Sequence, residues 1–133
     1  MIQRIQSLYL FFYLIIKSFL LYKSIKNESP LHFFVDNFDL FPLSLAVLIT
    51  TSLLVLLNFK NRKIQVKILY FLITIQLLIL VPIPILAFEA DKPLSFLWDY
   101  QSLLFFFGLV LLLFSLKGIK KDQNLINSID RIR

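Results

Sequence analysis

The feature that most constrains this chain is a set of four long apolar runs, each separated from the next by a short polar stretch. The runs cover about residues 7–25, 40–59, 64–88 and 94–116. About 20 apolar residues in a helix cross the ~30 Å hydrocarbon core of a bilayer. The chain has 133 residues and is 59% hydrophobic, more apolar surface than a globule of this size can bury. The pattern predicts a single-domain, all-α polytopic membrane protein, with four transmembrane helices in an up-down bundle.

The polar stretches between the runs contain residues that break or start helices. Pro30 lies in the first stretch, and Asp39 is the expected N-cap of the second helix. Pro42 then falls in the first turn, where its missing N–H removes no helical hydrogen bond. Pro82 and Pro84 lie in the third run and predict a kink or an early helix end there.

The first apolar run has two interpretations. Arg4 followed by an apolar stretch is typical of a signal peptide, but the bulky residues 18–22 offer no small-residue cleavage site. The run is also long enough to span a bilayer. We therefore expect it to remain in the protein as the first transmembrane helix.

Basic residues predict the orientation of the chain. A basic segment, residues 59–67, separates the second and third runs. With a cytoplasmic amino terminus, three basic residues (Lys23, Lys26 and Lys92) fall outside and ten fall inside. Such a bias follows the positive-inside rule. We expect a multi-pass protein of the bacterial inner membrane with both termini in the cytoplasm. The ten inner residues are Arg4, Lys60, Arg62, Lys63, Lys67, Lys117, Lys120, Lys121, Arg131 and Arg133.

The net charge of +6 is concentrated at the inner side, which favours membrane lipid over nucleic acid as the partner. Two other partners stay open: a membrane protein that binds the same face, and a second copy of the chain. The alternative is that these charges only set the topology. The candidate headgroup or partner face consists of Arg4, Lys60, Arg62, Lys63, Lys120, Lys121, Arg131 and Arg133.

Small and polar residues recur along the spans at intervals that keep them on one helix face. Such residues, rather than apolar ones, hold transmembrane helices together. One interpretation is that they line a packed bundle interior, and the other is that they line a polar substrate path. The third span offers only Thr74 and Gln76, which align less well. The other sets are Gln6, Tyr13, Lys17 and Ser24; Ser44, Thr51 and Asn58; and Gln101, Gly108 and Ser115.

Lys17 lies near the middle of the first span. A charge at that depth costs roughly 2.5–3.5 kcal/mol on insertion scales, so Lys17 is a candidate intramembrane polar site. No acidic residue lies in the core of a span to pair with it. Three roles stay open: a structural lysine facing the bundle, a side chain that extends to the interface, and a ligand or proton site.

Composition excludes several chemistries. The chain has no cysteine, a single histidine and two glycines, Gly108 and Gly118. These counts rule out disulfides, glycine-rich phosphate loops and paired-histidine zinc motifs. His32, Asp36 and Ser29 share one loop, but no nucleophile elbow accompanies them. We expect no catalytic, cofactor-binding or metal-binding residues and therefore no enzyme.

The polar tail, residues 117–133, contains a second helical pattern. Leu125, Ile129 and Ile132 form one apolar stripe, and Asp122 is the expected N-cap. The pattern predicts a short cytoplasmic amphipathic helix against the membrane surface or the inner ends of the bundle.

Two terminal segments carry a resemblance to a known family. The start, MIQRIQSLYL, and the end, IKKDQNLINSIDRIR, resemble those of small four-span membrane proteins of unknown function from Bacteroidota. The resemblance implies four helices and an inner-membrane location but no activity. Lys17 departs from the expected pattern of the family, so the resemblance assigns it no role.

These observations favour a non-enzymatic structural or accessory subunit that binds a partner protein or lipid headgroups through its basic cytoplasmic face. The alternative is a small transporter or channel component, for which acidic or histidine residues inside the spans would be the supporting signal. The sequence shows none there.

Overall fold

The computed structural model describes residues 3–26, 34–35, 38–59, 61–81 and 100–130. Its helices are α1 (Gln3–Ile25), α2 (Leu40–Leu57), α3 (Arg62–Leu80) and α5 (Tyr100–Asp130). Two short strands, β1 (Phe34–Val35) and β2 (Phe38–Asp39), pair antiparallel just before α2. Each of the four helices is long and apolar enough to cross a membrane. The prediction of four spans is confirmed, and the chain is a multi-pass membrane protein.

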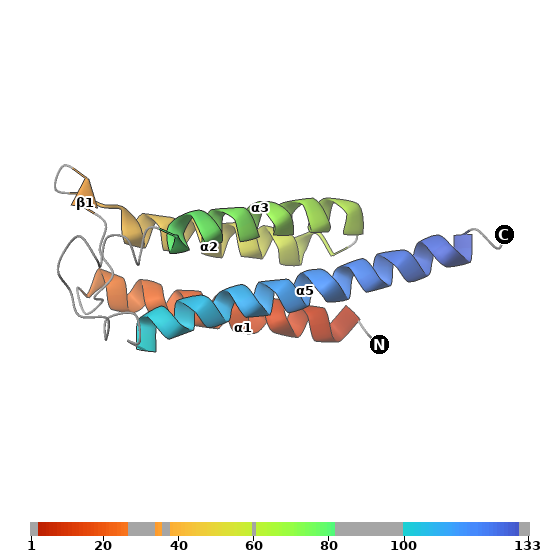
Figure 1. Cartoon of the computed structure of the whole chain (residues 1–133), viewed down its shortest axis with the longest axis horizontal. Helices are drawn as coiled ribbons and strands as arrows, with labels where there is room; N and C mark the ends of the chain where they lie inside the picture. The colour runs from red at the N-terminus through yellow and green to blue at the C-terminus, as the bar shows by residue number, and fades with distance from the viewer. Residues whose placement is uncertain (1–2, 27–33, 36–37, 60, 82–99, 131–133) are drawn as a thin grey trace.

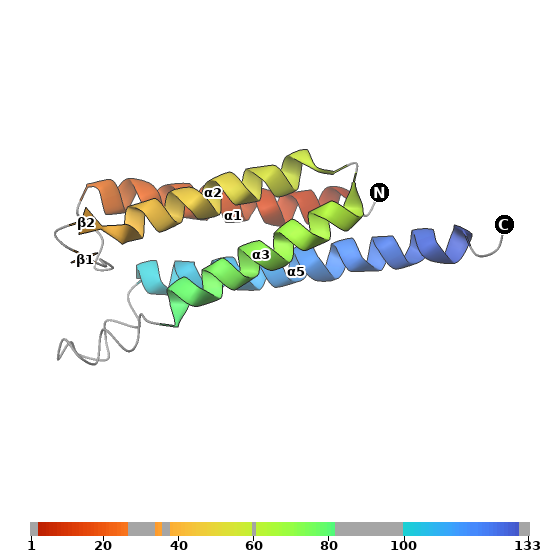
Figure 2. The same cartoon turned by 90° about the horizontal axis from the view of Figure 1, so that it is seen from above.

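The helices form an up-down bundle, since each runs antiparallel to the ones beside it (Figure 1). α1 packs against α2 and α5, and α3 packs against the same two helices, which closes a four-membered ring. The start of α1, the turn between α2 and α3, and the end of α5 all lie at one end of the bundle (Figures 1 and 2). We call this end the basic end, because residues 61–67 and 117–125 lie there.

The outer surface of the bundle is apolar, as lipid requires. Phe11 and Phe12 of α1, Leu78 of α3, and Phe107 and Phe114 of α5 are all largely exposed. Lipid tails are as apolar as these side chains, so such exposure carries no penalty in a bilayer. What distinguishes the interior is that it mixes apolar residues with polar ones, and the candidate site is built there.

α5 is much longer than the sequence predicts. It continues without a break from Tyr100 to Asp130, 31 residues or about 46 Å at 1.5 Å per residue, and it projects past the other helices at the basic end (Figure 2). The prediction of a separate short tail helix is therefore wrong, because α5 continues through residues 117–130. The end of the fourth span at residue 116 stays a prediction, since a helix can extend beyond the membrane. Asp122 is not an N-cap but an interior residue of α5. The apolar character stops at Lys117, but the backbone hydrogen bonds that define a helix do not depend on hydropathy.

Other boundaries, those of α1, α2 and α3, differ by two to four residues or not at all, except that α3 ends eight residues before the predicted end at residue 88. α1 begins at Gln3 and α3 at Arg62, slightly earlier than predicted, and α3 ends at Leu80. The backbone N–H of Val81 donates to the carbonyl of Leu77 at 2.9 Å. Pro82 and Pro84 lie outside the described residues, as do Ser29, Pro30, His32, Asp36 and residues 94–99.

Candidate functional site

The inner face of α5 carries a polar stripe with a spacing of seven residues. Gln101, Gly108 and Ser115 are all buried, which confirms that the predicted set faces the bundle interior. The same spacing continues to Asp122, which is only 5% exposed. Asp122 therefore belongs to the helix–helix contact, and extending the seven-residue interval past the apolar run would have identified it.

α1 lies antiparallel along this stripe. The predicted residues Gln6, Tyr13, Lys17 and Ser24 are all buried, and the register follows from three contacts. A Cβ on Gly118 would lie 2.7 Å from Cγ of Gln6, and one on Gly108 would lie 3.3 Å from the Tyr13 ring. Between these levels, the rings of Tyr9 and Phe114 are 5.9 Å apart. The two glycines let α1 approach α5 closely.

On α3 the polar interior residues are Gln65 and Gln76, both buried. The sequence interpretation missed Gln65 and undervalued Gln76. Thr74 is exposed and donates its hydroxyl to the carbonyl of Tyr70 on its own helix. Gln65 donates to the carbonyl of Val55 at 3.2 Å and so fastens α3 to α2. Gln65 and Gln76 are eleven residues apart, an interval that keeps them close to one helix face.

On α2 the predicted polar set does not line the interior. Ser44, Thr51 and Asn58 are half-buried, and each donates to a carbonyl of α2 itself three or four residues earlier. Such local bonds are the usual alternative for short polar side chains in a helix. The buried polar residue of α2 is Ser52, which also bonds within the helix, to Ile49. The rest of its inner face is apolar.

A polar cluster at mid-bundle joins three helices. The hydroxyl of Tyr13 on α1 donates to Oε1 of Gln76 on α3 at 2.7 Å. Nε2 of Gln76 then donates to the backbone carbonyl of Phe105 on α5 at 2.9 Å. Hydrogen bonds between transmembrane helices stabilise packing by about 0.6 kcal/mol on average. The cluster therefore fixes the register of α1, α3 and α5.

Lys17 lies beside this cluster, fully buried. Its Nζ lies 3.4 Å from the centroid of the Phe105 ring and 5.3 Å from that of Tyr13, and it makes no hydrogen bond. Gly108 leaves room for it, since an added Cβ would lie 3.3 Å from Cε of Lys17. This position in the bundle interior excludes one of the three predicted roles, a side chain that extends to the interface. It fits the other two, a structural lysine facing the bundle and a ligand or proton site. An ammonium over an aromatic face recovers about 2 kcal/mol when desolvated.

A second polar cluster closes the basic end. Nε2 of Gln6 donates to Oδ2 of Asp122 at 2.8 Å, and Nη1 of Arg62 lies 3.5 Å from the same oxygen. Arg62 begins α3, so the cluster ties the starts of α1 and α3 to α5. Arg62 was predicted to face headgroups, but the structure pairs it with a buried carboxylate.

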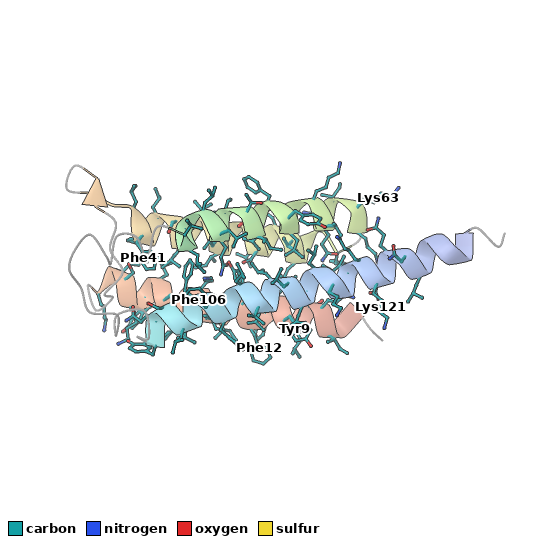
Figure 3. The ribbon with its side chains drawn as sticks, in the orientation of Figure 1. Tyr9, Phe12, Phe41, Lys63, Phe106 and Lys121 are labelled. Carbon is teal, nitrogen blue, oxygen red and sulfur yellow. The ribbon has the colours of Figure 1, made fainter. Side chains whose placement is uncertain are left out.

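The other predicted basic residues lie around the basic end rather than on one face. In Figure 3, Lys63 and Lys121 extend from opposite sides of the bundle. Lys120 lies on α5 with its Nζ 4.8 Å from the centroid of the Tyr70 ring on α3. The side chain of Arg4 is outside the described part of the chain, as are Lys60, Arg131 and Arg133. We define the basic collar as the exposed residues Lys63, Lys67, Lys117, Lys120 and Lys121.

Side chains of the types that ligate metals do not cluster in the described part of the bundle. Among the described residues no three histidine, cysteine, aspartate or glutamate side chains come together. An open, apolar groove runs along the outer face of α5 near its start. Its lining consists of Tyr100, Leu103, Leu104, Phe106, Phe107 and Val110.

Comparison with curated proteins and with solved structures finds no match. A family model described as "Domain of unknown function (DUF4293)" matches residues 21–132. The matched region includes the distinctive end of the chain, although the recognised start lies outside it. The resemblance to a family of unknown function is therefore confirmed. Since the match covers most of the sequence, the chain belongs to the DUF4293 family.

Proposed function

We propose that the protein is a non-enzymatic accessory subunit of the bacterial inner membrane that binds anionic lipid headgroups, or an acidic partner protein, through the basic collar. Both termini lie in the cytoplasm. The observation that carries the proposal is the position of the collar. Its five lysines are exposed and belong to the first turns of α3 and the later part of α5, and these segments lie toward the end of the bundle where N and C are marked (Figure 1).

Charge complementarity supports this role. The cytoplasmic leaflet has a negative surface potential, and each base near it contributes about 1 kcal/mol. Asp122, the acidic residue next to the collar in sequence, is buried and faces Arg62. It therefore does not cancel the exposed positive charge.

The buried polar residues support a structural rather than a catalytic role. Tyr13, Gln76 and Gln6 each bond to a neighbouring helix, and Gln65 bonds to the α2 backbone. Their hydrogen-bonding groups are used to hold helices in register.

The second candidate is a small transporter or channel component, and Lys17 is the observation that favours it. A fully buried amine without a hydrogen bond is typical of an ion or substrate pathway. A liposome flux assay separates the two functions: solute movement that Lys17→Leu abolishes would favour transport over the accessory role.

The collar is tested by purification in mild detergent followed by mass spectrometry of the co-purifying lipids and proteins. Replacing all five collar lysines by glutamine should remove enriched anionic lipid or an acidic partner. Lys23→Gln with Lys26→Gln, at the opposite end of the bundle, is the control and should retain them. Equal retention by the collar variant and the wild type would refute the proposal.

A further inference from the structure

We propose that the α3–α5 seam at the basic end is a binding site for one anionic phospholipid, with its phosphate between Lys67 and Lys120 and beside the hydroxyl of Tyr70. This proposal rests on the proposed function and deepens it. The collar as a whole supplies a diffuse positive field, whereas the seam supplies a defined position for a single headgroup.

The contact between Lys120 and Tyr70 defines the seam. Lys120 extends from α5 across to α3, where its Nζ lies 4.8 Å from the centroid of the Tyr70 ring. Tyr70 is 44% exposed, so both groups are accessible from the side of the bundle. An exposed cation–π contact is worth only about 0.5–1 kcal/mol. It therefore keeps the ammonium near α3 while leaving it able to turn toward a phosphate.

α3 places a second base next to this contact. Lys63, Lys67 and Tyr70 follow intervals of four and three, so they share one helix face, and all three are exposed. From the start of α3 at Arg62, Lys67 is about 7.5 Å deep and Tyr70 about 12 Å deep at 1.5 Å per residue. The polar layer of a bilayer is about 5–7 Å thick on each side. If α3 begins at the outer edge of this layer, Lys67 lies at its inner limit and Tyr70 lies about one helical turn deeper.

The polarity along the seam follows that of a phospholipid and not that of a free anion. The exposed stripe of α3 continues from Tyr70 through Thr74 to Leu77, so bases give way to an interfacial aromatic and then to an apolar surface. On α5 the exposed Leu113 lies two turns toward the membrane centre from Lys120. The bases can therefore hold a phosphate while the acyl chains lie on the apolar part of the two helices.

The test uses the full chain in nanodiscs of phosphatidylcholine with increasing amounts of phosphatidylglycerol, and native mass spectrometry to count retained phosphatidylglycerol. The seam variant is Lys67→Gln with Lys120→Gln. The control is Lys117→Gln with Lys121→Gln, which removes the same charge from outside the seam. At about a factor of five per base, we expect retention about 30-fold weaker in the seam variant and no more than about fivefold weaker in the control.

The outcomes separate the seam from the proposed function. Equal loss in both variants would overturn the seam and leave a diffuse collar. If the seam variant, the control and the variant lacking all five collar lysines all retain phosphatidylglycerol as the wild type does, the seam and the proposed lipid binding are both overturned. Lys67→Arg with Lys120→Arg should restore retention. Thermal stabilisation of the wild type by inorganic phosphate alone, to the same extent as by the lipid, would overturn the lipid assignment.

Discussion

At the scale of single residues, Lys17 is the most unusual side chain in the bundle. Inserting a charge at this depth costs roughly 2.5–3.5 kcal/mol, and stacking on an aromatic ring returns about 2 kcal/mol. Its Nζ has aromatic neighbours, Phe105 and Tyr13, but no hydrogen-bond acceptor. The balance is unfavourable by about 1 kcal/mol on these scales, so Lys17 does not serve stability.

Lys17→Leu should therefore raise the free energy of unfolding by about 1 kcal/mol, since it removes the buried amine and keeps an apolar side chain against Phe105. The midpoint of thermal unfolding in detergent measures this. Phe19→Leu, at an exposed position on the same helix, is the control and should change little. A fall in the unfolding midpoint would show that burying the Lys17 amine stabilises the protein, contrary to this estimate. If the unfolding midpoint rises but the variant no longer supports the activity of the protein in cells, Lys17 has a functional role.

Of the two glycines of α5, Gly118 has less room for a side chain than Gly108. A Cβ there would lie 2.7 Å from Cγ of Gln6, the side chain that holds Asp122. Gly118→Ala should therefore displace Gln6, break that bond and destabilise the protein by about 1–3 kcal/mol. Gly108→Ala, whose nearest contacts would be 3.3 Å, should cost less. Thermal unfolding of the two variants compares them, and the reverse order would show that the α1–α5 contact is looser than the structure indicates.

At the scale of helices, the apolar runs predicted the spans well because bilayer thickness fixes their length. α1, α2 and α3 were placed to within a few residues at most boundaries. The end of α5 could not be predicted in the same way, because hydropathy reports what surrounds a helix and not where its backbone stops. The short β1–β2 pair gave no signal, since two residues per strand carry no readable alternation.

The candidate site was predictable on α1 and α5, where regular spacing keeps the polar residues on the helix face that is buried. Gln101, Gly108 and Gln6 were correctly placed inside the bundle. Ser44 and Thr51 have the same spacing but can bond to their own helix, and they do. Sequence spacing cannot separate these alternatives, because both keep the residue on one face.

The continuity of α5 leads to a prediction about truncation. Ending the chain after Lys121 removes Asp122, and with it the acceptor for Gln6 and the ion pair with Arg62. Ending the chain after Leu125 keeps Asp122, its hydrogen bond from Gln6 and its ion pair with Arg62. The shorter chain should lose about 1–3 kcal/mol of stability through its unpaired Gln6 and Arg62, and the longer chain should match the full protein. Thermal unfolding and cellular abundance decide, and equal stability of the two truncated forms would show that the Asp122 cluster contributes nothing.

At the scale of the whole molecule, the fold and the charge distribution agree. The up-down order brings the start of α1, the α2–α3 turn and the end of α5 to one end (Figures 1 and 2), and the five collar lysines lie there as well. Two polar clusters then fasten the helices, one at mid-bundle around Gln76 and one at the basic end around Asp122. The second cluster therefore holds α1, α3 and α5 together at the end of the bundle that carries the basic collar.

The orientation of this bundle gives the last prediction. The sequence assigns ten basic residues to the expected cytoplasmic side and three to the expected outer side, and Lys17 lies within the first span. Positive residues in short loops are retained in the cytoplasm, and the antiparallel order of the four helices places both termini on one side. A reporter fused after Arg133 should therefore signal the cytoplasm, and one inserted at Ala90 should signal the outside. Replacing Lys60, Arg62 and Lys63 by glutamine should weaken this preference and yield a mixed population. The opposite pattern in the unmodified chain would place the basic collar against the outer leaflet and remove the basis of the proposed cytoplasmic interaction.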